Sequence, residues 1–165
     1  MHARCAVPIL IAALGMSAAP ALASSEVGHD RRIGAGIVVG DPNGLSGKIY
    51  LGGPLHAVDL AVAWDTWGWG GIYSHATYLI HPSVLHSENG VDIRWNVGVG
   101  GMLISGRSRF AYQSTMGIGA RAPIGLDFDL WDIPLQIFCS LSAEILIVPS
   151  TNVGLGLGLG VRYYF

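Results

Sequence analysis

Charge is scarce in this sequence, and the few charged residues are divided almost evenly between the two signs. Only 12% of the 165 residues are charged, with 9 Lys and Arg against 11 Asp and Glu. About a quarter of the residues are charged in an ordinary soluble domain. There is no basic stripe, so we expect no nucleic-acid partner. The mean hydropathy of +0.48 is high for a soluble domain.

Cysteines and long apolar runs are also scarce. The two cysteines are Cys5 and Cys139, and Cys5 falls in a predicted leader, so no intrachain disulfide is expected in the mature chain. Beyond the leader there is no run of about 18 apolar residues, so we expect no membrane-spanning helix. High hydropathy without such a run fits a lipid-facing β-barrel, in which apolar residues occupy alternate positions.

The first 23 residues predict a secretory signal peptide. A weakly basic start precedes an apolar stretch over residues 6–16, and the small residues of Ala21–Ala23 are typical of a cleavage site. A short membrane anchor is the alternative, but two prolines and a glycine interrupt the apolar part. We therefore expect residues 1–23 to be removed and residues 24–165 to form a single domain.

The final stretch, residues 153–165, alternates large apolar residues with glycine in the sequence VGLGLGLGVRYYF. A strand sends successive side chains to opposite faces, so one face is bulky and apolar while the other is nearly bare and carries Arg162. A strand of a soluble sandwich places its bulk inward and its charge outward. The reverse arrangement favours a strand whose outer face meets lipid and whose inner face lines a narrow polar interior. A glycine-rich edge strand of a soluble β protein is the alternative.

Alternation and turn signals along the rest of the chain predict an all-β fold, an eight-stranded antiparallel up-and-down transmembrane β-barrel. Residues 81–90 and 127–134 are expected to be connections, the second a turn with three aspartates. An even number of strands places both termini on the periplasmic side. A soluble lipocalin-like barrel, with its bulky face inside, is the alternative. The expected strands cover residues 33–39, 45–51, 57–64, 72–80, 91–105, 112–125, 135–148 and 153–165.

Charged residues within the expected strands fall almost entirely on alternate positions, on the strand face opposite the bulky apolar residues. Buried charges must be paired to be tolerated, so this pattern predicts an internal salt-bridge network. Eight strands enclose an interior that side chains can fill, which favours a filled structural barrel over the alternative of a narrow channel for small solutes. The expected network consists of Lys48, Asp59, His75, Asp92, Arg94, Arg121, Glu144 and Arg162.

Aromatic residues gather near the two expected rims. Trp64, Trp67 and Trp69 lie at one rim and Tyr163 and Phe165 at the other, which is typical of the aromatic girdles of a membrane barrel. The loops at residues 65–71 and 106–109 are the expected sites for an extracellular protein ligand.

Catalysis is not expected. Serine lies beside histidine in three places, Ser74 with His75, His81 with Ser83, and His86 with Ser87, and a lipid A-modifying hydrolase at the membrane edge is the alternative that these would serve. They lack a nucleophile elbow and a matching acid, and His81 and His86 are expected to be solvated in a turn. We expect no metal and no cofactor, because the histidines share no obvious face.

Three segments carry a family resemblance: GAGIVVGDPNGLSGK over residues 34–48, RAPIGL over 121–126 and GVRYYF over 160–165. Together they resemble a family of small, largely uncharacterised bacterial outer-membrane barrels, similar in architecture to the OmpA transmembrane domain and OmpX. The resemblance implies a place in the outer membrane, with its lipids as partners, and it transfers no catalytic residue. The ending also resembles the C-terminal signal that the barrel assembly machinery reads, here Leu157, Leu159, Val161, Tyr163 and Phe165.

Overall fold

The protein, seen in a computed structural model, is all-β throughout the part that is described, residues 31–41, 43–64, 71–88, 90–106, 116–130 and 132–165. Within these residues no helix has the length and apolar character needed to cross a membrane. The described residues form nine strands, and neighbouring strands run antiparallel. They are β1 (Ile33–Asp41), β2 (Asn43–Tyr50), β3 (His56–Trp64), β4 (Gly71–Ile80), β5 (Val84–Glu88), β6 (Val91–Gly106), β7 (Gly117–Leu130), β8 (Leu135–Val148) and β9 (Asn152–Tyr164).

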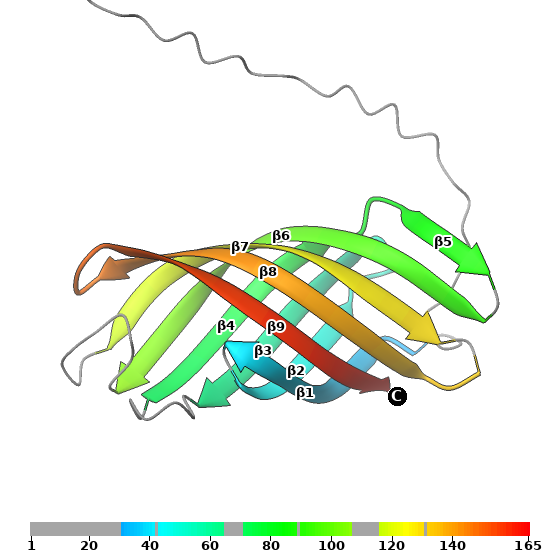
Figure 1. Cartoon of the computed structure of the whole chain (residues 1–165), viewed down its shortest axis with the longest axis horizontal. Helices are drawn as coiled ribbons and strands as arrows, with labels where there is room; N and C mark the ends of the chain where they lie inside the picture. The colour runs from blue at the N-terminus through cyan, green and yellow to red at the C-terminus, as the bar shows by residue number, and fades with distance from the viewer. Residues whose placement is uncertain (1–30, 42, 65–70, 89, 107–115, 131) are drawn as a thin grey trace, which may run out of the picture.

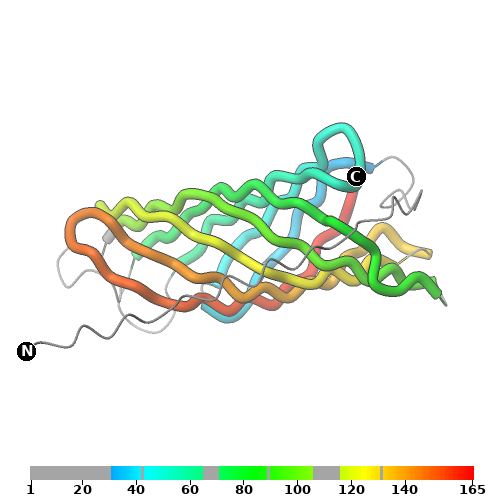
Figure 2. Tube along the Cα trace, turned by 90° about the horizontal axis from the view of Figure 1, so that it is seen from above, coloured from blue at the N-terminus to red at the C-terminus, as the bar shows by residue number. Residues whose placement is uncertain are grey.

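Eight of the nine strands close into a barrel (Figure 1). The strands follow the order β4-β3-β2-β1-β9-β8-β7-β6, and pairing of β4 with β6 completes the ring. In a view from above, the strands run obliquely along an elongated body, and the carboxyl terminus lies at the same end as the turn between β2 and β3 (Figure 2). The prediction of an eight-stranded antiparallel barrel is confirmed.

The short strand β5 was not predicted. It lies in the connection expected over residues 81–90 and pairs with the start of β6, with a register shift between Val84 and His86. In Figure 1 this hairpin projects from the end of the barrel that carries the carboxyl terminus. The segment has the composition of a polar loop because it carries the exposed residues His86, Ser87 and Glu88.

The expected turn over residues 127–134 is wrong in its first half. Strand β7 begins at Gly117 rather than at residue 112, and it continues to Leu130. Aspartate favours turns because its side chain bonds to nearby backbone, and this preference suggested a turn here. In the barrel Asp127 and Asp129 point inward and find charged partners, so tertiary contacts override the local preference.

Apolar side chains cover the outside of the barrel and form two small clusters inside it. Outward-facing residues of β9 are among the most exposed apolar side chains, from Val153 at 76% to Val161 at 38%. Inside, Tyr50, Ala57, Leu79 and Tyr164 cluster at the end where β2 and β9 finish. A second cluster, Met102, Ile104 and Leu146, lies where β6 and β8 finish, at the other end. Polar and charged side chains fill the space between these two clusters.

Candidate functional site

One deeply buried polar cluster is built around Asp127 of β7. Its Oδ2 atom lies 2.5 Å from Lys48 Nζ of β2 and 3.0 Å from His81 Nε2. Asn96 of β6 donates to the same oxygen at 3.0 Å. Lys48 is fully buried and Asp127 is 2% exposed. A buried ion pair of this kind tolerates desolvation because the carboxylate is satisfied by several donors.

His81 lies just beyond the end of β4, and burial lowers the pKa of its imidazole. The ring is therefore neutral at neutral pH and carries one N–H. Its Nε2 atom is 2.9 Å from Lys48 Nζ as well as 3.0 Å from Asp127, so it either accepts from the lysine or donates to the carboxylate. The expectation that His81 is solvated in a turn is wrong, because the barrel end closes over it.

A second cluster surrounds Arg162 of β9. Its guanidinium pairs with Asp59 of β3, donates to Ser46 at 2.9 Å, and lies over the Phe138 ring at 3.6 Å. Asp59 is also 3.1 Å from His75 Nε2 on the neighbouring strand β4. The arginine is thus held by partners from three strands, and Gly160 in β9 leaves room for the Phe138 ring on which it stacks.

A third cluster lies at the end of the interior nearest the carboxyl terminus. Arg94 Nη2 is 3.0 Å from Asp129 Oδ2, and Gln136 Nε2 donates to Asp129 Oδ1 at 2.7 Å. The Gln136 carbonyl accepts from Tyr164 at 3.0 Å and from Arg162 at 3.2 Å. Gln136 therefore joins the second and third clusters into one network.

A fourth cluster lies toward the opposite end. Glu144 of β8 accepts from Tyr73 at 3.0 Å and from Ser142 at 2.9 Å, and it lies 3.9 Å from Arg121 Nε. Arg121 and Glu144 face each other across β7 and β8, but the distance is that of a loose ion pair. Two nitrogen atoms of the buried Arg121 side chain, Nε and Nη1, have no hydrogen-bond partner within the described residues.

The structure places every residue of the expected network on the inward side of the barrel. Seven of these eight residues are brought into ion-pair distance of a partner, while Asp92 is 2% exposed and has one oxygen without a hydrogen-bond partner in the described part. Counting Asp127 and Asp129, the described interior holds four cations and five carboxylates. Sequence reasoning missed Asp127, Asp129, His81, Gln136, Tyr73 and Ser142. The alternation of LDFDL over residues 126–130 is the signal that could have revealed the two aspartates.

Two small cavities lie among these clusters. Each measures about 20 Å³, and both are lined by Asp59, Arg121, Phe138, Ser140 and Arg162. A polar cavity of this size holds about one water molecule, which would supply the partners that the Arg121 nitrogens lack. The cavities are too small for a solute larger than water.

The aromatic residues expected at the two rims lie at opposite ends of the barrel, as far as they belong to the described residues. Trp64 ends β3 and is 50% exposed, while Tyr163 and Phe165 contact each other at the carboxyl-terminal end, with ring centroids 5.3 Å apart. Trp67 and Trp69 lie outside the described residues. All five residues expected to form the assembly signal face outward. They are Leu157, Leu159, Val161, Tyr163 and Phe165.

None of the three serine–histidine neighbours makes a hydrogen bond between its two side chains in the described part of the chain. His75 contacts Asp59, while Ser83 accepts from the Trp95 indole at 2.9 Å. His86 is exposed and lies 3.9 Å from Glu88. The residues that can be described also contain no group of three or more His, Cys, Asp or Glu side chains arranged to hold a metal ion.

Replacing Glu144 with glutamine is expected to lower the free energy of unfolding by about 1–3 kcal/mol, the usual cost of leaving a buried polar partner unsatisfied. The loss stays moderate because Arg121 is 3.9 Å away and the glutamine can still accept from Tyr73. Urea titration of the protein in detergent, followed by tryptophan fluorescence, measures the change. Ser142→Ala is the matched control and should cost less, and an unchanged stability in Glu144→Gln would contradict the buried role of this carboxylate.

One solved structure matches this architecture, the N-terminal β-barrel domain of Pseudomonas aeruginosa OprF. The TM-score is 0.52 at 16% sequence identity, and the match covers 81% of this chain and 96% of that domain. No family model and no curated protein matches the sequence. At this identity the likeness shows the fold, and fold alone does not establish function.

Proposed function

We propose that this protein is an integral barrel of the bacterial outer membrane with a structural or surface-interaction role. The observation that carries the proposal is that charged side chains face the interior and apolar side chains face outward, which is the reverse of a soluble barrel. Nine buried or nearly buried charges lie inside, while exposed leucine, isoleucine and valine side chains cover the outside. A barrel in lipid needs this inversion because each strand alternates between lipid and interior.

The soluble lipocalin-like alternative requires the opposite arrangement. A water-soluble barrel exposes its polar face and encloses its apolar one. Here Leu155, Leu157 and Leu159 are each more than half exposed, and monomeric soluble proteins rarely carry continuous apolar patches of such extent. Lipid hydrocarbon is the solvent that best accounts for this surface.

The partners proposed for the barrel follow from the same arrangement. Outer-membrane lipids would surround the apolar belt, and the barrel assembly machinery would recognise the outward face of β9 during insertion. A protein ligand at the loops of residues 65–71 and 106–109 remains part of the proposal, although these loops lie mainly outside the described residues. No enzymatic activity is proposed, because Asp59, Asp127, Asp129 and Glu144 lie within ion-pair distance of cations and no described serine–histidine pair is assembled.

A filled interior favours the structural role over solute transport. The two apolar clusters lie toward the two ends of the polar network, and the described cavities hold about one water molecule each. An eight-stranded barrel has an interior that side chains can fill. A conducting pore would require several of the contacts around Asp127 and Arg162 to open together.

Membrane insertion is tested by comparing boiled and unboiled samples of the membrane fraction on SDS gels. A closed barrel resists SDS until it is heated, so the unboiled protein should migrate differently and should appear in the detergent-extracted outer-membrane fraction. Reconstituted into planar bilayers, the same preparation should give no stable conductance steps. Protein that stays in the soluble periplasmic fraction, with no heat-dependent shift, would contradict the proposed membrane location. Reproducible conductance steps would instead support a channel.

A further inference from the structure

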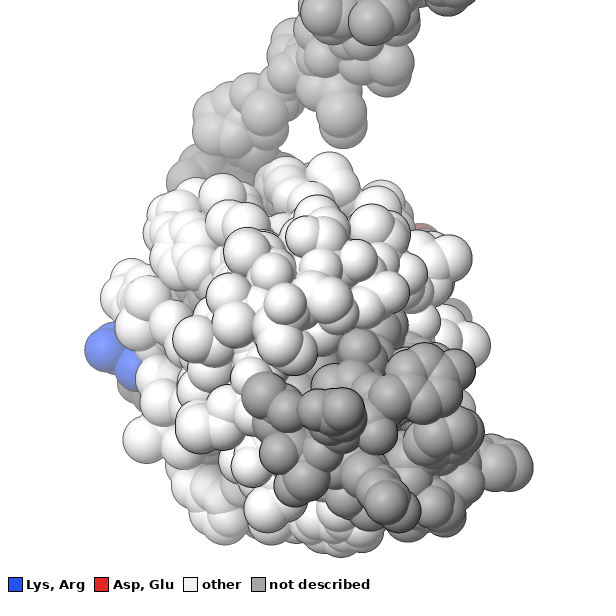
Figure 3. Space-filling view, turned by 90° about the vertical axis from the view of Figure 1, so that its left-hand side faces the viewer, with Lys and Arg blue, Asp and Glu red and all other residues white. Residues whose placement is uncertain are grey.

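Exposed positive charge is confined to one place on the described barrel. Within the residues that the structure describes, the exposed charged side chains are Arg31, Arg32, Asp41, Glu88 and Asp132, and all other charged side chains face the interior. Viewed from the end opposite the carboxyl terminus, the described surface is almost entirely uncharged, with basic atoms visible only at one margin (Figure 3). The two exposed cations are therefore neighbours in the sequence and lie immediately before β1.

Backbone contacts hold these two arginines at the rim of the barrel. The carbonyl of Arg32 accepts from the Tyr50 N–H at 2.9 Å, which ties it to the end of β2. On the other side of β1, the Ile33 carbonyl accepts from the Phe165 N–H at 2.9 Å. Arg31 Nη1 donates to the Tyr164 carbonyl at 3.5 Å. Both arginines therefore lie at the end of the barrel where β2 and β9 finish.

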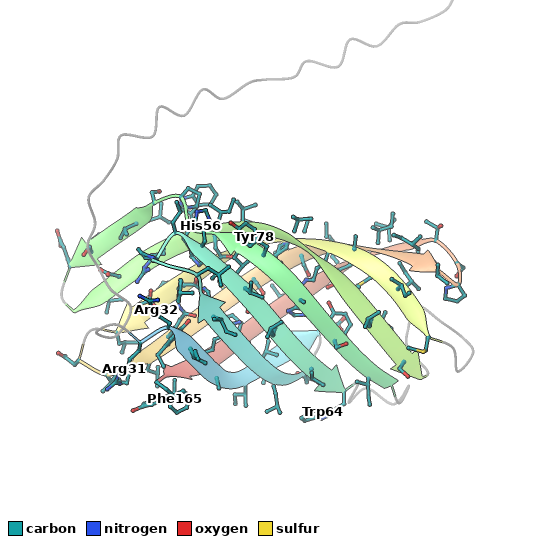
Figure 4. The ribbon with its side chains drawn as sticks, turned by 180° about the vertical axis from the view of Figure 1, so that it is seen from behind. Arg31, Arg32, His56, Trp64, Tyr78 and Phe165 are labelled. Carbon is teal, nitrogen blue, oxygen red and sulfur yellow. The ribbon has the colours of Figure 1, made fainter. Side chains whose placement is uncertain are left out.

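The surroundings of the arginines change from apolar to polar over a short distance. Ile33 is 54% exposed and Phe165 is 68% exposed, and both face outward directly beside the arginines. Figure 4 shows Arg31, Arg32 and Phe165 together at one end of the barrel, with His56 of β3 and Tyr78 of β4 toward the same end. Tyr78 and His56 form a hydrogen-bonded pair of 2.7 Å on the outer surface. Residues with an apolar body and a polar tip are typical of the boundary between hydrocarbon and headgroups.

We propose that Arg31 and Arg32 bind the phosphate of an anionic phospholipid in the membrane leaflet at the carboxyl-terminal end of the barrel. The inference rests on the proposed membrane location and adds a defined ligand site to it. The guanidinium group carries five N–H donors and matches the geometry of phosphate. Arg31 uses one nitrogen on the Tyr164 carbonyl, and no residue of the described part of the chain occupies its remaining donors.

The position suits a lipid better than a free anion. The acyl chains of a phospholipid would lie against the exposed Ile33 and Phe165, while the phosphate would meet the two guanidinium groups one residue beyond. The exposed acids of the same end lie on elements other than β1, because Glu88 ends β5 and Asp132 lies in the β7–β8 turn. A basic residue at a membrane surface contributes about 1 kcal/mol of attraction to anionic lipid, which is roughly a fivefold preference for each arginine.

The test uses the full chain reconstituted in phosphatidylcholine bilayers that contain spin-labelled lipid. Electron paramagnetic resonance gives the fraction of labelled lipid held at the protein, compared between phosphatidylglycerol and phosphatidylcholine labels. The wild type should prefer phosphatidylglycerol by about fivefold or more at low salt, and R31Q/R32Q should reduce this preference toward unity. The variant R107A/R109A removes the same net charge from another part of the sequence and should keep the preference.

Salt and folding controls make every outcome decisive. The wild-type preference should fall strongly in about 1 M salt, where the Debye length is about 3 Å. If R31Q/R32Q fails to fold, R107A/R109A decides the question, because a loss of the preference in that variant would place the lipid site elsewhere. Equal association of the two lipids with inserted, heat-modifiable wild type would overturn the lipid site but leave the membrane barrel intact. An equal loss in both double variants, or a preference unaffected by salt, would also overturn it. Wild type that does not insert at all would overturn the proposed function itself.

Discussion

Replacing Asp127 with asparagine is expected to lower the free energy of unfolding by about 3–5 kcal/mol, the usual cost of removing one partner of a buried ion pair. The substitution preserves the shape of the side chain but leaves the ammonium of Lys48 without its counter-charge. Lys48 is fully buried and its Nζ atom lies 2.5 Å from the carboxylate. Its other close contact is the neutral His81 ring at 2.9 Å, which cannot replace a negative charge.

The size of this effect depends on the position of the cluster inside the barrel. Asp127 Oδ2 accepts hydrogen bonds from Lys48 and Asn96 and lies within hydrogen-bonding distance of His81 Nε2. These three residues belong to β2, β6 and the β4–β5 connection. A single carboxylate thus links segments on several sides of the interior. Its loss should be transmitted to all of them, because the barrel interior is packed and water is nearly excluded.

Urea unfolding in detergent, followed by tryptophan fluorescence and by heat-dependent gel migration, measures the change. Asp132→Asn is the matched control, since Asp132 is exposed, and it should change stability by less than about 0.5 kcal/mol. The double variant K48M/D127N should recover at least half of the loss, because it removes both charges together. Asp127→Asn with wild-type stability would mean that Lys48 is solvated in the folded barrel.

Replacing Gly36 with alanine is expected to prevent normal closure of the barrel. A methyl group built at Gly36 would lie 1.8 Å from the Val161 carbonyl oxygen and 2.8 Å from the Arg162 Cα. Both atoms belong to the backbone of β9, the strand that pairs with β1, so no side-chain rotation can relieve the contact. Overpacking against backbone should cost about 3 kcal/mol or more, and the heat-modifiable form should be strongly reduced.

Gly47→Ala provides the matched control on the adjacent strand. A methyl group at Gly47 would find its nearest neighbours at 3.8 and 4.0 Å, which is ordinary van der Waals contact. This variant should fold with wild-type yield and stability, and Gly→Ala at a compatible site can even stabilise slightly. If the two variants behaved alike, the close approach of β1 and β9 at Gly36 would be refuted.

Much of the barrel could be predicted from alternation, because each strand of a lipid-facing barrel has two chemically opposite faces. The outward leucines of β9 and the inward positions of Arg121, Glu144 and Arg162 follow from a period of two. Alternation also continues through Asp127 and Asp129, although three aspartates near a proline locally favour a turn. His81 could not be placed from its own segment, because it enters the interior from a connection that has no strand period.

The sequence by itself determined which residues face inward, since alternation within a strand is a local property of the extended backbone. It also determined the antiparallel order of strands joined by short connections. Only the tertiary structure decided which charges meet: Lys48 pairs with Asp127 rather than with its cross-strand neighbour Asp59, and Asp59 pairs with Arg162. Contacts across the interior depend on barrel closure, strand tilt and register acting together, and these bring residues 79 and 103 positions apart within hydrogen-bonding reach.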